Sequence, residues 1–145
     1  MKRIIHFLFI ALIVSSCGSS KKMLEKGNYD AAINAAVKKL RKDRDNEKNI
    51  EALDRAYQIA NQQDQERVTF LEREDNPNNY EEVFAIYTRM KNRQSLVRTV
   101  TPLNLNGRTI DYPYVDYDAK IIAAKRKAAE YFYGSGKSLM SSSIN

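Results

Sequence analysis

The stretch from Asn46 to Glu74 contains neither glycine nor proline, and this feature constrains the fold more than any other in the chain. Apolar residues recur along the stretch at the spacing of one helix face: Ile50, Leu53, Tyr57, Ala60, Val68 and Leu71. This spacing predicts one long helix over 46–74, although the polar residues at 62–64 leave open a break into two helices. Because Asn61 and Asp64 fall near the stripe, the middle of the helix should be poorly buried or face polar groups.

Shorter stripes predict helices before this segment. Asn28 opens a helix whose inner face carries Ala32, Ile33, Ala36, Val37 and Leu40. Gly27 would end a preceding short helix at about 21–26, since glycine often terminates helices.

Two further helices are expected after the long one. Asn79, with Glu82 three residues later, resembles a capping box and starts a helix that runs to about Arg98. A last helix begins at Asp116 or Asp118 as its cap. Its expected inner face consists of Ile121, Ile122, Ala124, Ala128, Ala129, Phe132 and Leu139. The glycines at 134 and 136 should kink or fray it.

Between these last two helices, the spacing of apolar residues changes from the helical period to alternation, which predicts a β-hairpin around 103–112. Apolar residues alternate on both sides of Asn106-Gly107, a dipeptide that favours a two-residue turn because both positions need positive φ. Such a turn pairs Leu105 with Arg108 and Leu103 with Ile110. The predicted fold class is therefore all-α with one small hairpin insertion.

Cys17 is the only cysteine in the chain, and the residues before it have the layout of a secretory signal peptide. Lys2-Arg3 precedes an apolar run from Ile4 to Val14, and small residues follow. Val14-Ser15-Ser16-Cys17 resembles the lipobox of bacterial lipoproteins. The resemblance implies that residues 1–16 are removed and that Cys17 carries a covalent lipid. Residues 17–22 would then be a flexible tether, 23–140 a helical domain and 141–145 a disordered tail.

Other roles for Cys17 are less well supported. The apolar run has 11 residues, whereas a membrane-spanning helix needs about 20. A disulfide has no second cysteine in the chain, and a cysteine nucleophile would need a histidine, of which the chain has only His6.

The residues after Cys17 suggest where such a lipoprotein would reside. In many Gram-negative lipoproteins an aspartate in the next position retains the protein at the inner membrane, but this chain has Gly18. Some Bacteroidetes lipoproteins carry an acidic surface signal here, whereas this chain has Lys21-Lys22. The resemblance therefore implies the outer membrane, with the protein facing the periplasm.

Composition limits the chemistry of the mature chain. After residue 16 the sequence has no histidine, no tryptophan and no cysteine beyond Cys17. Zinc, copper and haem sites lose their usual ligands, and neither a Ser-His-Asp nor a Cys-His site can form. We therefore expect no enzyme activity, metal or cofactor other than the lipid. Nucleic acid is not expected as a partner because the compartment excludes it.

Gly27-Asn28-Tyr29-Asp30-Ala31-Ala32-Ile33 resembles the middle of a tetratricopeptide repeat, with Ala32 at the small packing position. Leu53, Ala56 and Tyr57 resemble the first helix of a following repeat. The pattern then departs, because Asn61-Gln62-Gln63 replaces the glycine turn and Ala36 replaces a large aromatic residue. The whole chain also resembles Bacteroidetes-type lipoproteins built on tetratricopeptide-like helices. This implies antiparallel helical pairs and no particular activity.

Three surface features have alternative interpretations. Tyrosines gather near the hairpin and last helix, where they would either bind sugar or peptide or pack at a domain edge. The candidate partner surface consists of Tyr112, Tyr114, Tyr117 and Phe132. The basic run Lys38–Arg44 would contact anionic lipid or peptidoglycan, or form a solvated helix face. Glu72, Glu74 and Asp75 would serve a glycosidase only if they flanked a groove, and are otherwise ordinary surface charge.

Two functional hypotheses follow. The first is a lipid-anchored, non-enzymatic helical adaptor that contacts an envelope protein. The alternative is an envelope lipoprotein that binds glycan or peptidoglycan through its tyrosines, and a hydrolase based on Asp and Glu is a distant third. The sequence leaves the partner and the oligomeric state open.

Overall fold

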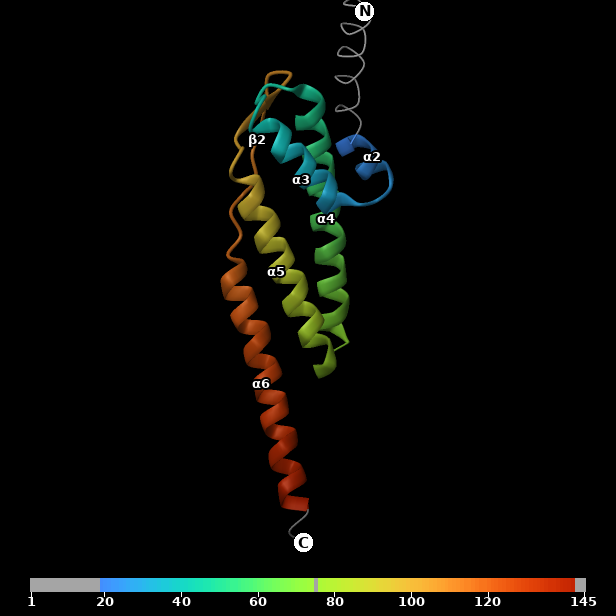
Figure 1. Cartoon of the computed structure of the whole chain (residues 1–145). Helices are drawn as coiled ribbons and strands as arrows, with labels where there is room; N and C mark the ends of the chain where they lie inside the picture. Colours follow the sequence, from blue (N-terminus) through green and yellow to red (C-terminus); the bar gives the residue numbers. More distant parts are fainter. Residues whose placement is uncertain (1–18, 75, 143–145) are drawn as a thin grey trace, which may run out of the picture. The chain divides into compact units, whose positions relative to one another are not determined.

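The computed structural model describes residues 19–74 and 76–142 (Figure 1). These residues are mostly helical and contain one small antiparallel sheet, so the all-α prediction with a hairpin is confirmed. The helices are α2 (Ser19–Glu25), α3 (Tyr29–Leu40), α4 (Glu47–Arg73), α5 (Tyr80–Val97) and α6 (Tyr117–Ser142), with a short 3-10 helix η2 (Pro77–Asn79) before α5. The strands are β1 (Leu103–Leu105) and β2 (Arg108–Ile110). Cys17 and the expected signal peptide lie outside the described residues.

Helix α4 has no break at residues 62–64, which confirms the prediction of one long helix. The boundary between two compact units falls within it. Unit 1 contains the described residues up to Gln58 together with Thr99–Asp111, and unit 2 contains Ile59–Arg98 and the described residues from Tyr112 onward.

The core of unit 1 contains the apolar stripe predicted for α3. Every member of that stripe is buried, as are Ile50 and Leu53 of α4. Gly27, at φ +73°, turns the chain between α2 and α3, and the Asn28 side chain caps α3 by accepting a hydrogen bond from the Ala31 backbone N–H at 3.3 Å.

Helix α2 begins at Ser19 and thus includes residues 19–22, which were expected to belong to a tether. The reason is a buried contact: Ser20 is buried, and its hydroxyl donates to Asn49 Oδ1 at 3.2 Å. The basic run after α3 also has a structural role. Arg41 donates to Thr99 Oγ1 at 3.1 Å, and Arg44 donates to the Pro102 carbonyl at 2.7 Å.

The hairpin has the predicted register, with Leu103 opposite Ile110 and Leu105 opposite Arg108. Asn106 and Gly107 adopt φ of +52° and +79°, as a two-residue turn of this type requires. Leu103 and Ile110 are both buried, so the hairpin contributes one apolar face to unit 1.

The core of unit 2 lies among the second part of α4, α5 and the start of α6. Its buried residues are Val68, Leu71, Val83, Ile86, Tyr87, Met90, Tyr117 and Ala124. Gln94 holds the chain before α6: its amide donates to the Val115 carbonyl at 3.0 Å and accepts from the Val115 N–H at 2.9 Å. Asp116 is the cap of α6, because its side chain accepts from the Ala119 N–H at 3.0 Å.

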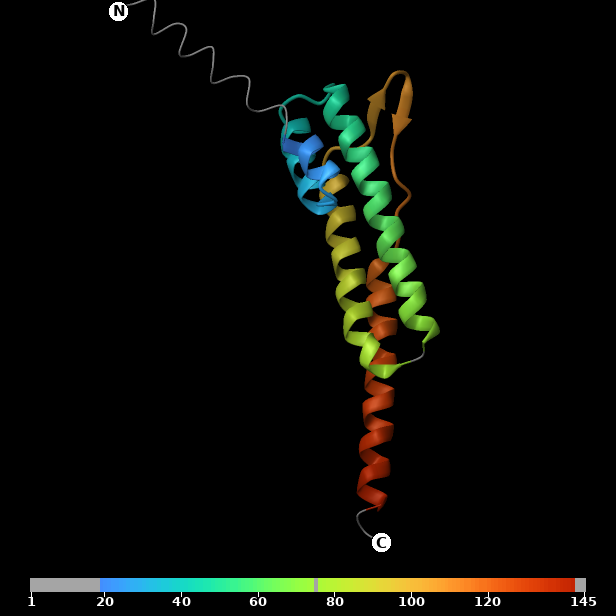
Figure 2. The same cartoon turned by 90° about the vertical axis from the view of Figure 1, so that its right-hand side faces the viewer.

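The predicted inner face of α6 is only partly correct. Ala124 is buried, and Ile121 and Ala128 are half-buried. Ile122, Ala129, Phe132 and Leu139 are exposed instead. Ile122 and Ala129 are exposed because they lie on the side of α6 away from the core. Leu139 belongs to the C-terminal end of α6, which continues past the Tyr80 end of α5 (Figure 2).

Helix α6 is continuous through the glycines at 134 and 136 and includes Ser141 and Ser142, which were expected to be disordered. The hydroxyls of these two serines donate to the carbonyls of Ser138 and Leu139 at 2.8 and 2.9 Å.

Candidate functional site

Exposed apolar side chains of the described residues gather on α6. Ile122, Tyr131, Phe132, Tyr133, Leu139 and Met140 are all exposed large hydrophobic residues on this helix. Tyr133 reaches 75% exposure, Leu139 71% and Met140 69%. A concentration of exposed apolar surface usually marks an interaction site. Helix α6 is therefore the candidate functional site.

One row of these residues lies on the side of α6 away from the core. Ile122, Ala129, Tyr133 and Met140 are seven, four and seven positions apart, which places them on one helix face. We call these four residues the outer stripe. Lys125 and Arg126 each lie three or four positions from both Ile122 and Ala129, and Lys137 lies likewise between Tyr133 and Met140. Because residues at this spacing are surface neighbours, basic side chains flank the stripe.

A groove of about 380 Å³ lies beside Phe132 and is lined by Pro77, Asn78, Tyr80, Glu81, Phe84, Lys125, Ala128 and Phe132. We call it the aromatic groove. The Lys125 Nζ lies 4.6 Å from the centre of the Phe84 ring, a cation–π geometry. The Phe132 ring meets the Tyr131 ring edge-on at 5.5 Å between centroids. The groove thus combines aromatic walls with one cation and one carboxylate.

The structure does not bring the four sequence-predicted surface residues together. Tyr117 is buried in the core of unit 2, with its ring centroid 6.4 Å from that of Tyr87. Tyr114 is exposed beneath the Arg98 guanidinium at 5.3 Å, and Tyr112 is half-buried. Phe132 lies 15 positions after Tyr117, about 22 Å along the helix. Of the four, only Phe132 belongs to the apolar surface of α6.

The predicted inner face is wrong for two members of the outer stripe, Ile122 and Ala129, which are exposed. Helix α6 carries two apolar rows, and periodicity alone does not tell which row faces the core.

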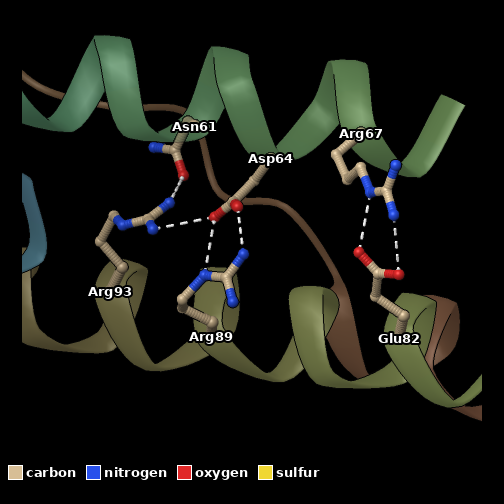
Figure 3. Close-up of polar contacts among 6 residues, drawn as sticks. All are labelled: Asn61, Asp64, Arg67, Glu82, Arg89 and Arg93. Carbon is tan, nitrogen blue, oxygen red and sulfur yellow. Dashed lines mark hydrogen bonds and ion pairs between the residues drawn. The ribbon is translucent and has the colours of Figure 1, made fainter. Parts of the chain in front are cut away.

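A second feature of unit 2 is a buried ionic cluster between α4 and α5 (Figure 3). Asp64 accepts hydrogen bonds from Arg89 Nε at 3.2 Å and Arg93 Nη2 at 2.9 Å, and it also pairs with Arg89 Nη2. Arg93 Nη1 donates to Asn61 Oδ1 at 2.7 Å. Asp64 and Arg93 are buried. Asn61 and Asp64 of α4 therefore face polar partners, which was one of the two alternatives expected for the middle of this helix. The Asp64 carboxylate, bonded to both arginines, joins α4 to α5.

A neighbouring ion pair between the same helices is exposed. Arg67 Nε and Nη2 donate to the two Glu82 carboxylate oxygens at 2.7 and 2.9 Å (Figure 3). The hydrogen bond from Arg67 lowers the pKa of Glu82, and the same bond raises the pKa of Arg67. This exposed pair can therefore serve as a control when the contribution of the buried cluster to stability is measured.

The acidic residues near the end of α4 have local partners. Glu72 accepts a hydrogen bond from the Tyr87 hydroxyl at 3.5 Å, and Glu74 accepts one from Asn79 at 2.9 Å. Asp75 lies outside the described residues. Glu72 therefore contacts the middle of α5 and Glu74 the last residue of η2, and both carboxylates lie on exposed residues.

Unit 1 has a hydrophilic groove of about 560 Å³, lined by Glu47, Lys48, Glu51, Asp54, Arg55, Gln58, Leu105, Asn106 and Arg108. Asp54 accepts from Gln58 at 2.8 Å and from Arg108 at 3.2 Å. Over residues 19–74 and 76–142, no cluster of three or more potential metal ligands occurs. Within the same ranges, no helix is long and apolar enough to cross a membrane.

Tyr87 gives unit 2 a predicted dependence on alkaline pH. Burial, assisted by the nearby Glu72 carboxylate, raises the pKa of Tyr87 from 10.0 to about 12. The unfolded chain therefore loses this proton at lower pH than the folded chain, so stability is full below pH 10 and falls as pH rises towards 12. Tyr87→Phe should flatten the fall in urea midpoint between pH 9.5 and 11.5. Tyr133→Phe, at an exposed ring, should retain the wild-type slope, and equal slopes in both variants would contradict the prediction.

Comparison of the chain with protein-family models, with curated proteins and with solved structures gave no match.

Proposed function

We propose that the chain is a lipid-anchored, non-enzymatic adaptor that binds a protein partner at the bacterial envelope. The observation that carries the proposal is the exposure of six large apolar residues on α6. Leaving such side chains in water forgoes the free energy of their burial, about 1.5–3 kcal/mol for a full side chain. A protein partner that covers α6 would recover this free energy.

The anchor part of the proposal rests on the sequence around Cys17. Val14-Ser15-Ser16-Cys17 and the preceding basic and apolar segments support removal of residues 1–16 and lipidation of Cys17. The covalent lipid is the one non-protein group proposed. The protein would be held at the outer membrane and face the periplasm, where α6 would be accessible to other envelope proteins.

A tetratricopeptide-like pairing is proposed for α2 and α3 alone. Gly27 at positive φ and the Asn28 cap support it, since they separate two consecutive helices as the repeat's glycine turn does. Helix α4, at 27 residues, has no turn where a second repeat would need one. The adaptor function does not depend on further repeats.

The alternative function is glycan or peptidoglycan binding, and one observation favours it. Tyr114 is 65% exposed and has the Arg98 guanidinium over its ring, an arrangement that offers an apolar face and polar donors to a sugar. Tyr117 is buried and is therefore not available to bind a sugar, although it was among the aromatic residues expected on this surface. Retention of the wild type on purified peptidoglycan, lost in Tyr112→Ala/Tyr114→Ala, would favour this alternative over the adaptor.

Affinity purification from detergent-solubilised membranes tests the adaptor. Phe132→Ser/Leu139→Ser removes two exposed apolar side chains and should reduce the recovered partner about tenfold, the equivalent of about 1.4 kcal/mol of binding free energy. Phe70→Ser, at an exposed ring on α4, is the matched control and should recover the wild-type amount. Quantitative mass spectrometry gives the ratio, and circular dichroism verifies the helix content of each variant. A wild-type protein that recovers nothing above background would contradict the proposed function.

A further inference from the structure

The outer stripe has the relief of a helix-binding surface. Ile122, Tyr133 and Met140 project from it, whereas Ala129 and Gly136 are small. Gly136 lies seven positions after Ala129 and thus belongs to the same face. A Cβ placed on Gly136 would have nothing within 4 Å, so the surface there is open. Alternating large and small residues over 18 positions, about 27 Å, match the knobs and holes of an adjacent helix.

The charges beside the stripe define the partner's chemistry. Lys125, Arg126 and Lys137 flank it, whereas the one acidic residue from Ile122 to Ser142 is Glu130. Glu130 lies 3.9 Å from Arg126, an i,i+4 pair on the helix surface. Residues that flank an apolar seam select the partner through charge. The stripe therefore favours a helix with carboxylates on both sides of its own apolar row.

This chemistry argues against a second copy of α6. Two outer stripes in contact would place Lys125, Arg126 and Lys137 of each chain against the same cations of the other chain. Like charges brought together at an interface cost free energy and suppress association. Complementary charge thus favours a different chain.

The width of the stripe argues against a bilayer. A helix that lies in a membrane interface presents a broad apolar face, at least about 100° wide, rich in Trp, Phe and Leu. The outer stripe is a narrow row beside Lys125, Arg126 and Lys137, and it contains the small residue Ala129, with Gly136 on the same face. Lipid chains gain little from such a row, whereas a helix packs against it closely.

We propose that the outer stripe of α6 binds an amphipathic helix of a protein partner whose apolar row is flanked by Asp and Glu. The inference rests on the proposed adaptor function and specifies the partner's chemistry. It assigns recognition to Ile122, Tyr133 and Met140, with Lys125, Arg126 and Lys137 setting the charge preference.

Photo-crosslinking of the full chain in cells tests this inference. Tyr133→p-benzoylphenylalanine places a photoreactive ring on the stripe, and Phe70→p-benzoylphenylalanine places the same group on an exposed site of α4. After irradiation, mass spectrometry identifies the crosslinked segment. We expect an adduct from position 133, absent from position 70, on a helical segment with apolar residues at three- and four-residue spacing and acidic flanks.

Charge reversal gives a second measurement. Lys125→Glu/Lys137→Glu should reduce the yield of the position-133 adduct at least about tenfold, because the flanks would then repel carboxylates. Lys38→Glu/Lys42→Glu, at two exposed lysines in unit 1, changes the net charge equally and should leave the yield unchanged. An equal reduction in both variants would overturn the assignment of charge recognition to α6.

The remaining outcomes separate this inference from the adaptor function. Adducts only with copies of this chain, or only with lipid, would overturn the inference. An adduct with a basic or non-helical protein segment would overturn the acidic-helix partner while leaving the adaptor intact. The adaptor itself fails when the wild-type protein recovers no partner from solubilised membranes.

Discussion

Asp64→Ala should lower the free energy of unfolding by about 3–5 kcal/mol, the usual cost of removing one member of a buried ion pair. Asp64 is the carboxylate that Arg89 and Arg93 share, and the Arg93 side chain is 3% exposed. Without the carboxylate, the buried Arg93 guanidinium loses an ionic partner and lies beside the Arg89 cation. Urea denaturation monitored by circular dichroism measures the change.

The exposed Arg67–Glu82 pair provides the matched control, because it joins the same two helices. Glu82→Ala should leave the urea midpoint close to that of the wild type, as exposed pairs contribute little. Asp64→Leu/Arg93→Met should recover much of the lost stability, since replacing a whole buried pair with apolar groups is often neutral. Equal effects of Asp64→Ala and Glu82→Ala would show that burial of the cluster is unimportant.

Cys17→Ala should move nearly all of the protein from the membrane fraction to the soluble fraction. The proposed anchor is a covalent lipid on this residue, and alanine has no thiol to acylate. Metabolic labelling with a radioactive fatty acid, followed by membrane fractionation, measures both acylation and location.

Ser16→Ala is the control for Cys17→Ala, because it preserves a small residue at the expected cleavage site. This variant should be acylated and membrane-bound like the wild type. A Cys17→Ala protein that still carries the label and stays with the membrane would show that the lipobox interpretation is wrong. Loss of membrane attachment in both Cys17→Ala and Ser16→Ala would point to a defect in export.

The parts of the fold that sequence predicted are those fixed by local chemistry. Asn106-Gly107 determines the hairpin register because its two positive φ angles admit few alternatives. The α3 stripe is unambiguous because the helix has one apolar face. In α4, the lack of glycine and proline favoured one long helix, which is continuous in the structure, although the polar residues at 62–64 left a break open.

The parts that sequence did not predict depend on distant partners. Arg89 and Arg93 are 25 and 29 positions from Asp64, and nothing local identifies them as its partners. Ser20 was placed in a tether because its partner, Asn49, is 29 positions away. On α6, the two apolar rows are equivalent by spacing, and packing against the core of unit 2 decides which row is covered.

The double hydrogen bond between Gln94 and Val115 has a mechanical consequence. The Gln94 amide both donates to and accepts from the backbone of Val115, as a neighbouring strand would. The segment before α6 therefore cannot slide by one residue without losing both bonds. A partner that pulls on α6 along its axis would transmit the load to α5 through Gln94, so that the two helices would resist tension together.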